Sequence, residues 1–181
     1  MKNLIVKKCK FHNDAQTSCS LMIDDLVPVA VSLDGEFGPF NDWGYYTDSE
    51  KSLYKYFDNH LLRKFSEIRG TIFLPIDSHN YVSTNHGYKI KNRGFDKEFL
   101  DFLNRISNRF EFAFHGIKHA WGDDLGKNIH EFSSLDFGQL QKKQSLLNDF
   151  SKKNNINFIG GKFPGYRYNN HALNFIKDND F

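Results

Sequence analysis

The chain has 181 residues, of which 39% are hydrophobic and 25% are charged, and its formal net charge is +2 at pH 7. A disordered chain would lack the 19 Phe and 8 Tyr found here, so a folded globular protein is expected. The 24 Lys and Arg residues are scattered and form no basic stripe, which argues against nucleic-acid binding. No stretch approaches the roughly 18 apolar residues of a membrane span.

The beginning of the chain shows no targeting signal. Residues 1–14 contain one apolar run, Leu4-Ile5-Val6, which is too short for the core of a signal peptide. Cys9 and Cys19 form no CxxC pattern, and two thiols in an intracellular chain of this size are expected to be free. We therefore predict a cytoplasmic protein. No repeat or linker divides residues 1–181, which predicts a single domain, whereas the sequence leaves the oligomeric state open.

Strand and helix patterns alternate along the chain. The expected strands cover residues 18–23, 70–76, 110–114 and 156–161, and the expected helices cover 49–68, 95–107, 136–152 and 170–178. Asn169 or Asn170 is the expected cap of the last helix. Successive strand–helix units predict an α/β fold with a parallel sheet, which is either doubly wound or part of a barrel.

Polar side chains follow every expected strand. In parallel α/β sheets the active site lies outside the carboxyl ends of the strands, on the loops that lead into the helices. The four strands run into Asp24-Asp25, Asp77-Ser78-His79, the segment from His115 to His119, and the segment from Lys162 to Arg167. The fold thus predicts that an Asp pair and a His pair converge at one edge of the sheet.

Two imidazoles and one carboxylate suit a catalytic zinc ion, since three protein ligands leave one position for water. The metal would lower the pKa of this water toward about 7, and a second carboxylate would accept its proton. Asp24 and Asp25 can divide these roles. Each pair has an ordinary explanation when it stands alone, because an Asp pair is more often a turn or a cap and a His pair more often belongs to a loop or core.

Three segments resemble, in order, motifs of the polysaccharide deacetylases, also called carbohydrate esterase family 4. Residues 20–25 (SLMIDD) are similar to its strand ending in TFDDG, residues 115–119 (HGIKH) to its HxxxH element, often written HS/TxxH, and residues 162–166 (KFPGY) to its RxPxG motif. Residues 70–76 also resemble its second strand, ATFFVxG. The resemblance spans nearly the whole chain.

The resemblance implies a distorted (β/α) barrel that removes acetyl groups from N-acetylated or O-acetylated saccharides. It assigns Asp24 as the catalytic base and a divalent metal, usually zinc, to Asp25, His115 and His119. Lys162 aligns with the Arg that steadies the base, and Arg167 is a substitute for it. The backbone amide near Gly165-Tyr166 would help to hold the oxyanion.

The chain departs from the family pattern at several positions. Leu26 stands where the family has Gly, and Gly116 replaces the Ser or Thr of the histidine motif. Lys162 offers a point charge in place of a planar guanidinium. The later motifs, including the Leu-x-His segment with the general acid, have no counterpart, and the barrel has more units than the four expected here. We therefore expect a catalytic domain without its C-terminal part.

Two other functions stay open at this stage. A non-catalytic carbohydrate-binding pseudoenzyme would retain the metal cleft and carry out no chemistry. An unrelated metal-dependent hydrolase would act on another amide or on a phosphoester. Turnover separates the first alternative from a deacetylase, and substrate profiling separates the second.

Overall fold

The computed structural model describes residues 21–32, 58–77, 89–92, 94–117, 120–122 and 128–178. Of residues 29–32, 89–92, 120–122 and 128–130 it describes the backbone alone. The strands are β1 Leu21–Asp24, β2 Val29–Ser32, β3 Gly70–Leu74, β4 Lys89–Asn92, β5 Phe110–Phe114, β6 Ala120–Gly122 and β7 Asn128–His130. The helices are a π-helix at Asp58–Leu62, α2 Lys97–Ile106, α3 Phe137–Asn154, a 3₁₀ turn at Pro164–Tyr166 and α4 Asn170–Asp178.

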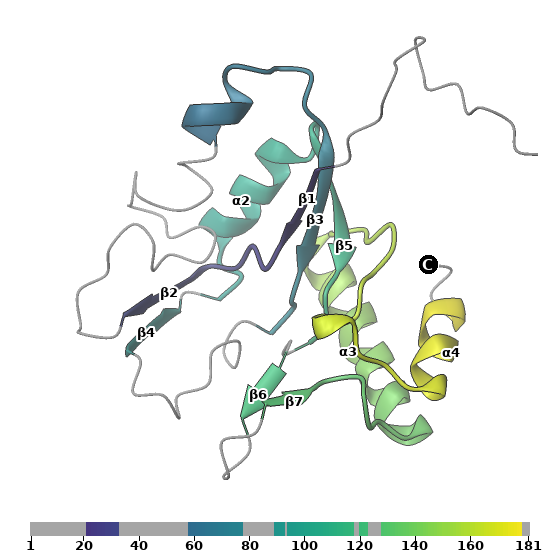
Figure 1. Cartoon of the computed structure of the whole chain (residues 1–181). Helices are drawn as coiled ribbons and strands as arrows, with labels where there is room; N and C mark the ends of the chain where they lie inside the picture. The colour runs from purple at the N-terminus through teal and green to yellow at the C-terminus, as the bar shows by residue number, and fades with distance from the viewer. Residues whose placement is uncertain are drawn as a thin grey trace, which may run out of the picture.

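A three-stranded parallel sheet in the order β1-β3-β5 forms the centre of the fold (Figure 1). Asp24 pairs with Phe73, and Leu74 pairs with Phe114, so the three strands end at nearly the same level. The connections between parallel strands must cross over, and α2 lies in the crossover from β3 to β5. The prediction of an α/β fold with a parallel sheet is therefore confirmed.

The fourth expected strand, over residues 156–161, is present as an extended segment rather than a regular strand. It lies parallel to β5 with one bridge, Phe114 to Gly161. The Phe114 amide donates to the Gly160 carbonyl at 2.9 Å, and the Lys162 amide donates to the Phe114 carbonyl at 2.9 Å. The pair Gly160-Gly161 explains the short pairing, because Gly in a strand has no side chain to pack and loses more conformational freedom.

The helices agree with the predicted ranges to different degrees. Helix α4 has the predicted bounds, and each end of α2 and of α3 lies one or two residues from its predicted position. The helix expected over 49–68 is the exception. Residues 49–57 lie outside the described part, and of residues 58–68 only Asp58–Leu62 are helical, as a π-helix. The Arg109 guanidinium donates to the carbonyls of Leu62, Phe65 and Ile68, which fixes the following segment in a non-helical path.

The core lies between the sheet and the helices α2, α3 and α4. Strands β3 and β5 contribute Ile72, Leu74 and Phe112, and α2 contributes the fully buried Phe99. Helix α2 begins at Asp96, whose side chain accepts from the Phe99 amide, and α3 begins with a capping box. The ring of Phe95, directly before α2, lies 4.7 Å from that of Phe150 in α3, so α2 and α3 pack side by side on the same face of the sheet.

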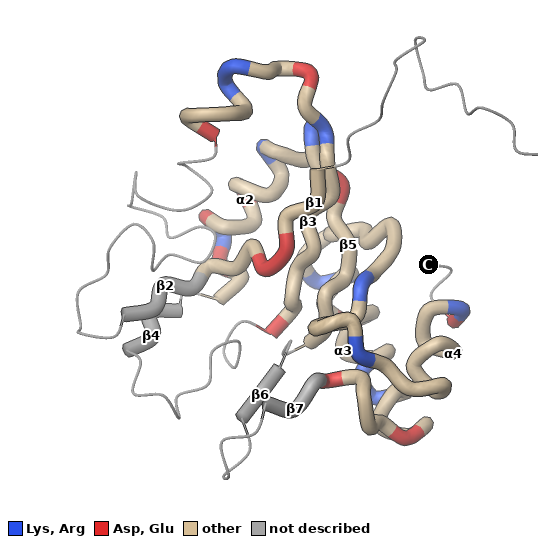
Figure 2. Tube along the Cα trace, in the orientation of Figure 1, with Lys and Arg blue, Asp and Glu red and all other residues tan. Residues whose placement is uncertain are grey.

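Two small antiparallel pairs, which the sequence did not indicate, leave the sheet at its carboxyl edge. Strand β2 follows β1 and pairs with β4, while β6 and β7 pair with each other after β5. Acidic and basic residues are scattered over the described chain, and one acidic stretch lies at the end of β1 on the way to β2 (Figure 2). Among the described helices, none has the length and apolar character needed to cross a bilayer.

Candidate active site

Three strand exits meet at the carboxyl edge of the sheet. The Asp25 amide donates to the Phe73 carbonyl at 3.0 Å, and the His115 amide donates to the Leu74 carbonyl at 3.0 Å. Together with the bond from the Lys162 amide to Phe114, these bonds carry the parallel pairing one step beyond each strand. The residue after each strand is thus fixed in register with its neighbours, as the sequence predicted for this edge.

Asp24 and Lys162 form an ion pair between the first and the fourth exit. The Lys162 Nζ lies 2.5 Å from both Oδ1 and Oδ2 of Asp24. It also lies 4.4 Å from the centre of the Phe73 ring and 5.2 Å from that of Tyr166. A cation between two aromatic faces gains electrostatic attraction from both rings, so Lys162 is held over Asp24. The resemblance of residues 162–166 to the RxPxG motif implied that Lys162 lies beside Asp24.

Asp25 and His115 form the second pair of the site. His115 is 2% exposed, and its Nδ1 lies 2.8 Å from the Lys162 carbonyl oxygen. Because a carbonyl can only accept a hydrogen bond, Nδ1 carries a proton. In the neutral ring Nε2 then has a lone pair, and this atom lies 3.5 Å from Asp25 Oδ1. Two electron-pair donors therefore face each other across a short gap.

The spacing of these two donors fits a shared cation. Two ligands with bonds of about 2.1 Å to a tetrahedral zinc ion lie about 3.4 Å apart. The observed separation of 3.5 Å agrees with this value. A backbone carbonyl behind the other ring nitrogen is the arrangement that orients metal-binding histidines. A proton on Nε2 would join the same two atoms as an ion pair, so metal binding is the measurement that separates the two states.

The third predicted ligand, His119, lies outside the described residues, as do Lys118 and His79. Among the residues that the structure describes, no group of three His, Cys, Asp or Glu side chains is placed to hold a metal. The described part of the site therefore contains two of the three predicted ligands, Asp25 and His115. The complete set with His119 stays a prediction.

The exits have unusual backbone conformations. Asp25 has φ 63° and Tyr166 has φ 55°, and they are two of the three non-glycine residues with positive φ in the described chain. Such conformations cost free energy and occur often at functional sites, where the surrounding structure fixes them. After Asp25 the chain turns inward, and Leu26 is 2% exposed. The Leu26 side chain belongs to the hydrophobic core at this turn.

The third motif forms a tight turn. The Tyr166 amide donates to the Phe163 carbonyl at 3.0 Å within the 3₁₀ turn, and a role of the amides near Gly165-Tyr166 in holding an oxyanion stays a prediction. The Tyr166 side chain is 73% exposed. Arg167 is exposed, and within the described chain Asp24 pairs with Lys162 rather than with Arg167. A role for Arg167 in catalysis stays a prediction.

Glu131 is a site residue that the sequence analysis missed. It is 0% exposed, its Oε2 accepts from the Ile117 amide at 2.8 Å, and its Oε1 contacts the Lys143 ammonium of α3. The carboxylate thus reaches the middle of the predicted histidine motif. No motif in the sequence marks it, since Glu131 stands between His130 and Phe132 without a recognisable pattern around it.

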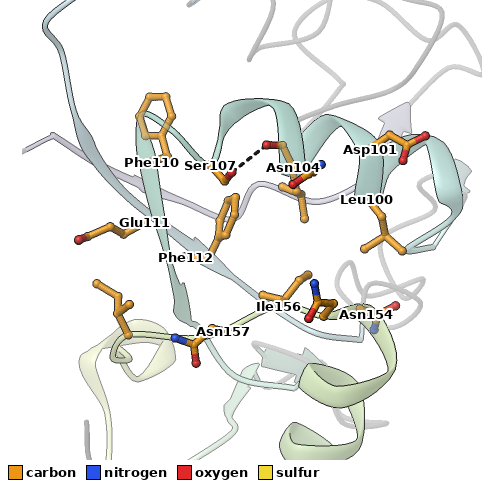
Figure 3. A pocket seen from close by; sticks show the side chains of 13 residues that line it. Leu100, Asp101, Asn104, Ser107, Phe110, Glu111, Phe112, Asn154, Ile156 and Asn157 are labelled. Carbon is orange, nitrogen blue, oxygen red and sulfur yellow. Dashed lines mark hydrogen bonds between the residues drawn. The ribbon is translucent and has the colours of Figure 1, made fainter.

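A separate hollow of about 510 Å³ lies at the opposite end of β5 (Figure 3). The C-terminal half of α2, the beginning of β5 and the segment after α3 line it, with Asn104, Glu111 and Asn157 among the polar side chains. None of the predicted site residues belongs to it. Because parallel α/β sheets bind their ligands at the carboxyl ends of the strands, the exits remain the candidate site.

Comparison with protein-family models, with curated proteins and with solved structures finds no match to this chain. The functional argument therefore depends on the geometry of the strand exits and on the resemblance of the three short motifs.

Proposed function

We propose that this chain is a metal-dependent hydrolase that removes acetyl groups from N-acetylated or O-acetylated saccharides. The observation that carries the proposal is the 3.5 Å separation of Asp25 Oδ1 and His115 Nε2, with the other ring nitrogen held by the Lys162 carbonyl. We infer as well that the parallel sheet is part of a distorted (β/α) barrel. The extended segment over residues 156–161 favours this arrangement, because it lies parallel to β5 beside the three-stranded sheet.

Asp25, His115 and His119 would hold the ion. One carboxylate and two imidazoles are a set of ligands that suits zinc. When bound, a divalent cation lowers the pKa of water toward about 7 and polarises the substrate carbonyl. Two features support Asp25 and His115 as ligands. The left-handed backbone of Asp25 sets the direction of its side chain, and the hydrogen bond from His115 Nδ1 orients the imidazole.

Asp24 would accept the proton of the attacking water. Its neighbour Lys162 donates to it at 2.5 Å, which orients the carboxylate for proton transfer. The water oxygen would bond to the acetyl carbon while the bond from this carbon to the sugar nitrogen or oxygen breaks. The proton taken by Asp24 would pass to this leaving atom, so that the products are acetate and an amine or alcohol.

The inference of a saccharide substrate has two supports. One is the resemblance of three ordered segments to the deacetylase motifs. The other is the exposed Tyr166 ring beside Lys162, since flat aromatic surfaces stack on the apolar faces of sugar rings.

The test combines metal binding with turnover. We expect the wild-type chain to bind one Zn²⁺ or Co²⁺ per molecule and to release acetate from acetylated oligosaccharides. Asp25→Ala should lose the ion, because it removes one of three ligands. Asp24→Asn should keep the ion and lose acetate release by about 10²- to 10⁴-fold, because it removes the base. Asp149→Asn on the exposed face of α3 is the matched control and should change neither quantity.

Several outcomes would contradict the proposal. Unchanged acetate release by Asp24→Asn would exclude this residue as the base. Metal binding without turnover on any acetylated sugar would favour a carbohydrate-binding pseudoenzyme. Hydrolysis of phosphoesters alone would show that the site belongs to a different metal-dependent hydrolase.

A further inference from the structure

Glu131 carries a fully buried carboxylate directly behind the candidate site. A Glu with 0% exposure is rare, because transfer of a charge out of water is costly unless partners compensate for it. Its Oε1 contacts the Lys143 ammonium, whose side chain is 14% exposed and which also lies 5.6 Å from the Phe132 ring centre. Its Oε2 accepts from the Ile117 amide at 2.8 Å. The buried charge is thus directed at the chain segment between His115 and His119.

The backbone around Ile117 is held from two sides. The Gly116 and Ile117 carbonyls accept from the amides of Ile76 and Asp77, at 3.1 and 2.7 Å, which belong to the exit of β3. Glu131 binds the same turn through the Ile117 amide. Because the turn starts at His115, these bonds restrict the direction in which the imidazole leaves the sheet.

Gly116 shows that the carboxylate and the turn fit each other. Gly116 has φ 89°, and a Cβ at this position would lie 2.5 Å from Glu131 Oε2 and 2.7 Å from Pro164 Cγ. Any side chain at position 116 would therefore collide with the Glu131 carboxylate and with Pro164, which follows Lys162 in the chain. The replacement of the family's Ser or Thr by Gly leaves the space that the Glu131 carboxylate occupies.

We propose that Glu131, held by Lys143, is a positioning residue that fixes the turn after β5 and thereby aims His115 at the cation shared with Asp25. This inference rests on the proposed function, since it requires that Asp25 and His115 bind a divalent cation. The acceptor oxygen toward Ile117 is the essential group. The charge of Glu131 serves to pair with Lys143.

The test separates the acceptor from the charge. The double variant E131Q/K143M removes both charges and keeps an oxygen that accepts from the Ile117 amide. The double variant E131M/K143M has a similar shape and charge but has no such oxygen. Binding of Co²⁺ is measured for each by calorimetry and by the visible absorption of the bound ion, and unfolding in urea is measured in parallel.

We expect E131Q/K143M to bind Co²⁺ within about threefold of the wild-type chain and E131M/K143M to bind it about 10- to 100-fold more weakly, the usual effect of removing a group that orients a metal ligand. Equal Co²⁺ affinities in the two double variants would overturn the inference alone. If the wild-type chain binds no Co²⁺ that depends on Asp25, the proposed function fails and the inference fails with it.

A second measurement covers the case in which E131M/K143M does not fold. Amide hydrogen exchange of Ile117 is followed in the wild-type chain and in E131Q/K143M. We expect slow exchange in both, because both retain the acceptor. Exchange of the wild-type Ile117 amide at the rate of a solvent-exposed amide would overturn the inference, since Glu131 would then not hold the turn.

Discussion

Lys162 acts on both halves of the candidate site through different groups. Its ammonium pairs with Asp24, and its backbone carbonyl accepts from His115 Nδ1. A substitution of this side chain therefore separates the two contacts, because any residue at position 162 retains the carbonyl. The orientation of His115 should survive a change that removes the cation from Asp24.

The first prediction at the residue scale concerns the charge of Lys162. Lys162→Met should lower acetate release by about 10- to 100-fold, since a hydrogen bond to a charged group contributes about 1.5–3 kcal/mol. Lys162→Arg should retain more activity than Lys162→Met, because a guanidinium also donates to both carboxylate oxygens. Metal affinity should stay near that of the wild-type chain in both variants.

Steady-state acetate release and Co²⁺ titration check this prediction. Lys142→Met on the exposed face of α3 is the control for the loss of one positive charge. Equal activity of Lys162→Met and the wild-type chain would show that Asp24 needs no cation beside it. Lys162 would then have no role in catalysis.

At the scale of the elements, helix caps connect the helices to the rest of the fold. Asn169 caps α4, since its Oδ1 accepts from the Ala172 amide at 3.0 Å, which agrees with one of the two predicted caps. Its Nδ2 donates to the Leu135 carbonyl at 2.8 Å, and its amide donates to the Phe132 carbonyl. Asn169 therefore also ties the start of α4 to the segment before α3.

The second of these predictions compares Asn169 with a simple cap. Asp96→Ala should lower the free energy of unfolding by about 1 kcal/mol, the usual cost of a lost cap. Asn169→Ala should cost about 2 kcal/mol, because it also leaves the Leu135 carbonyl without this donor. Asn169→Asp keeps the cap acceptor and should cost about 1 kcal/mol less than Asn169→Ala. Urea unfolding measures all three. Equal losses of unfolding free energy for Asp96→Ala and Asn169→Ala would show that the bond from Asn169 to the Leu135 carbonyl adds no stability.

The elements also show where sequence patterns suffice. Strand β5 and helix α4 have the predicted bounds because local signals, an apolar run and a capping Asn, coincide with their ends. The pairs β2–β4 and β6–β7 were not predicted, because strands of three or four residues are too short to show an alternating pattern. Strand β2 also pairs with a segment more than 50 residues away.

At the scale of the whole molecule, one aromatic cluster joins the sheet to the helices behind the site. The ring of Phe132 is fully buried and lies 6.0 Å from Phe114, 5.0 Å from Phe163 and 5.5 Å from Phe175, measured between ring centres. These residues come from β5, from the fourth exit and from α4. The packing around Phe132 therefore holds several strand exits at one level.

The last prediction concerns this cluster. Phe132→Ala should lower the free energy of unfolding by about 3–5 kcal/mol, since it removes buried apolar surface and leaves a cavity. Phe137→Ala, at a position that is 56% exposed, is the matched control and should change it by about 0.5 kcal/mol or less. Urea unfolding measures both. A loss below about 1 kcal/mol for Phe132→Ala would show that the cluster does not stabilise the fold.

The sequence by itself determined the strands of the parallel sheet, the helices α2, α3 and α4 and the strand ends at which polar residues gather, because periodicity and capping are local properties. The resemblance to the deacetylase motifs, rather than any local pattern, indicated Lys162 as the partner of Asp24. Only the tertiary structure decided that the Lys162 carbonyl orients His115, that the Tyr166 amide is engaged within its turn, and that Glu131 holds the turn after β5. These contacts join residues 3 to 47 positions apart, and their geometry depends on backbone directions that residue types do not encode.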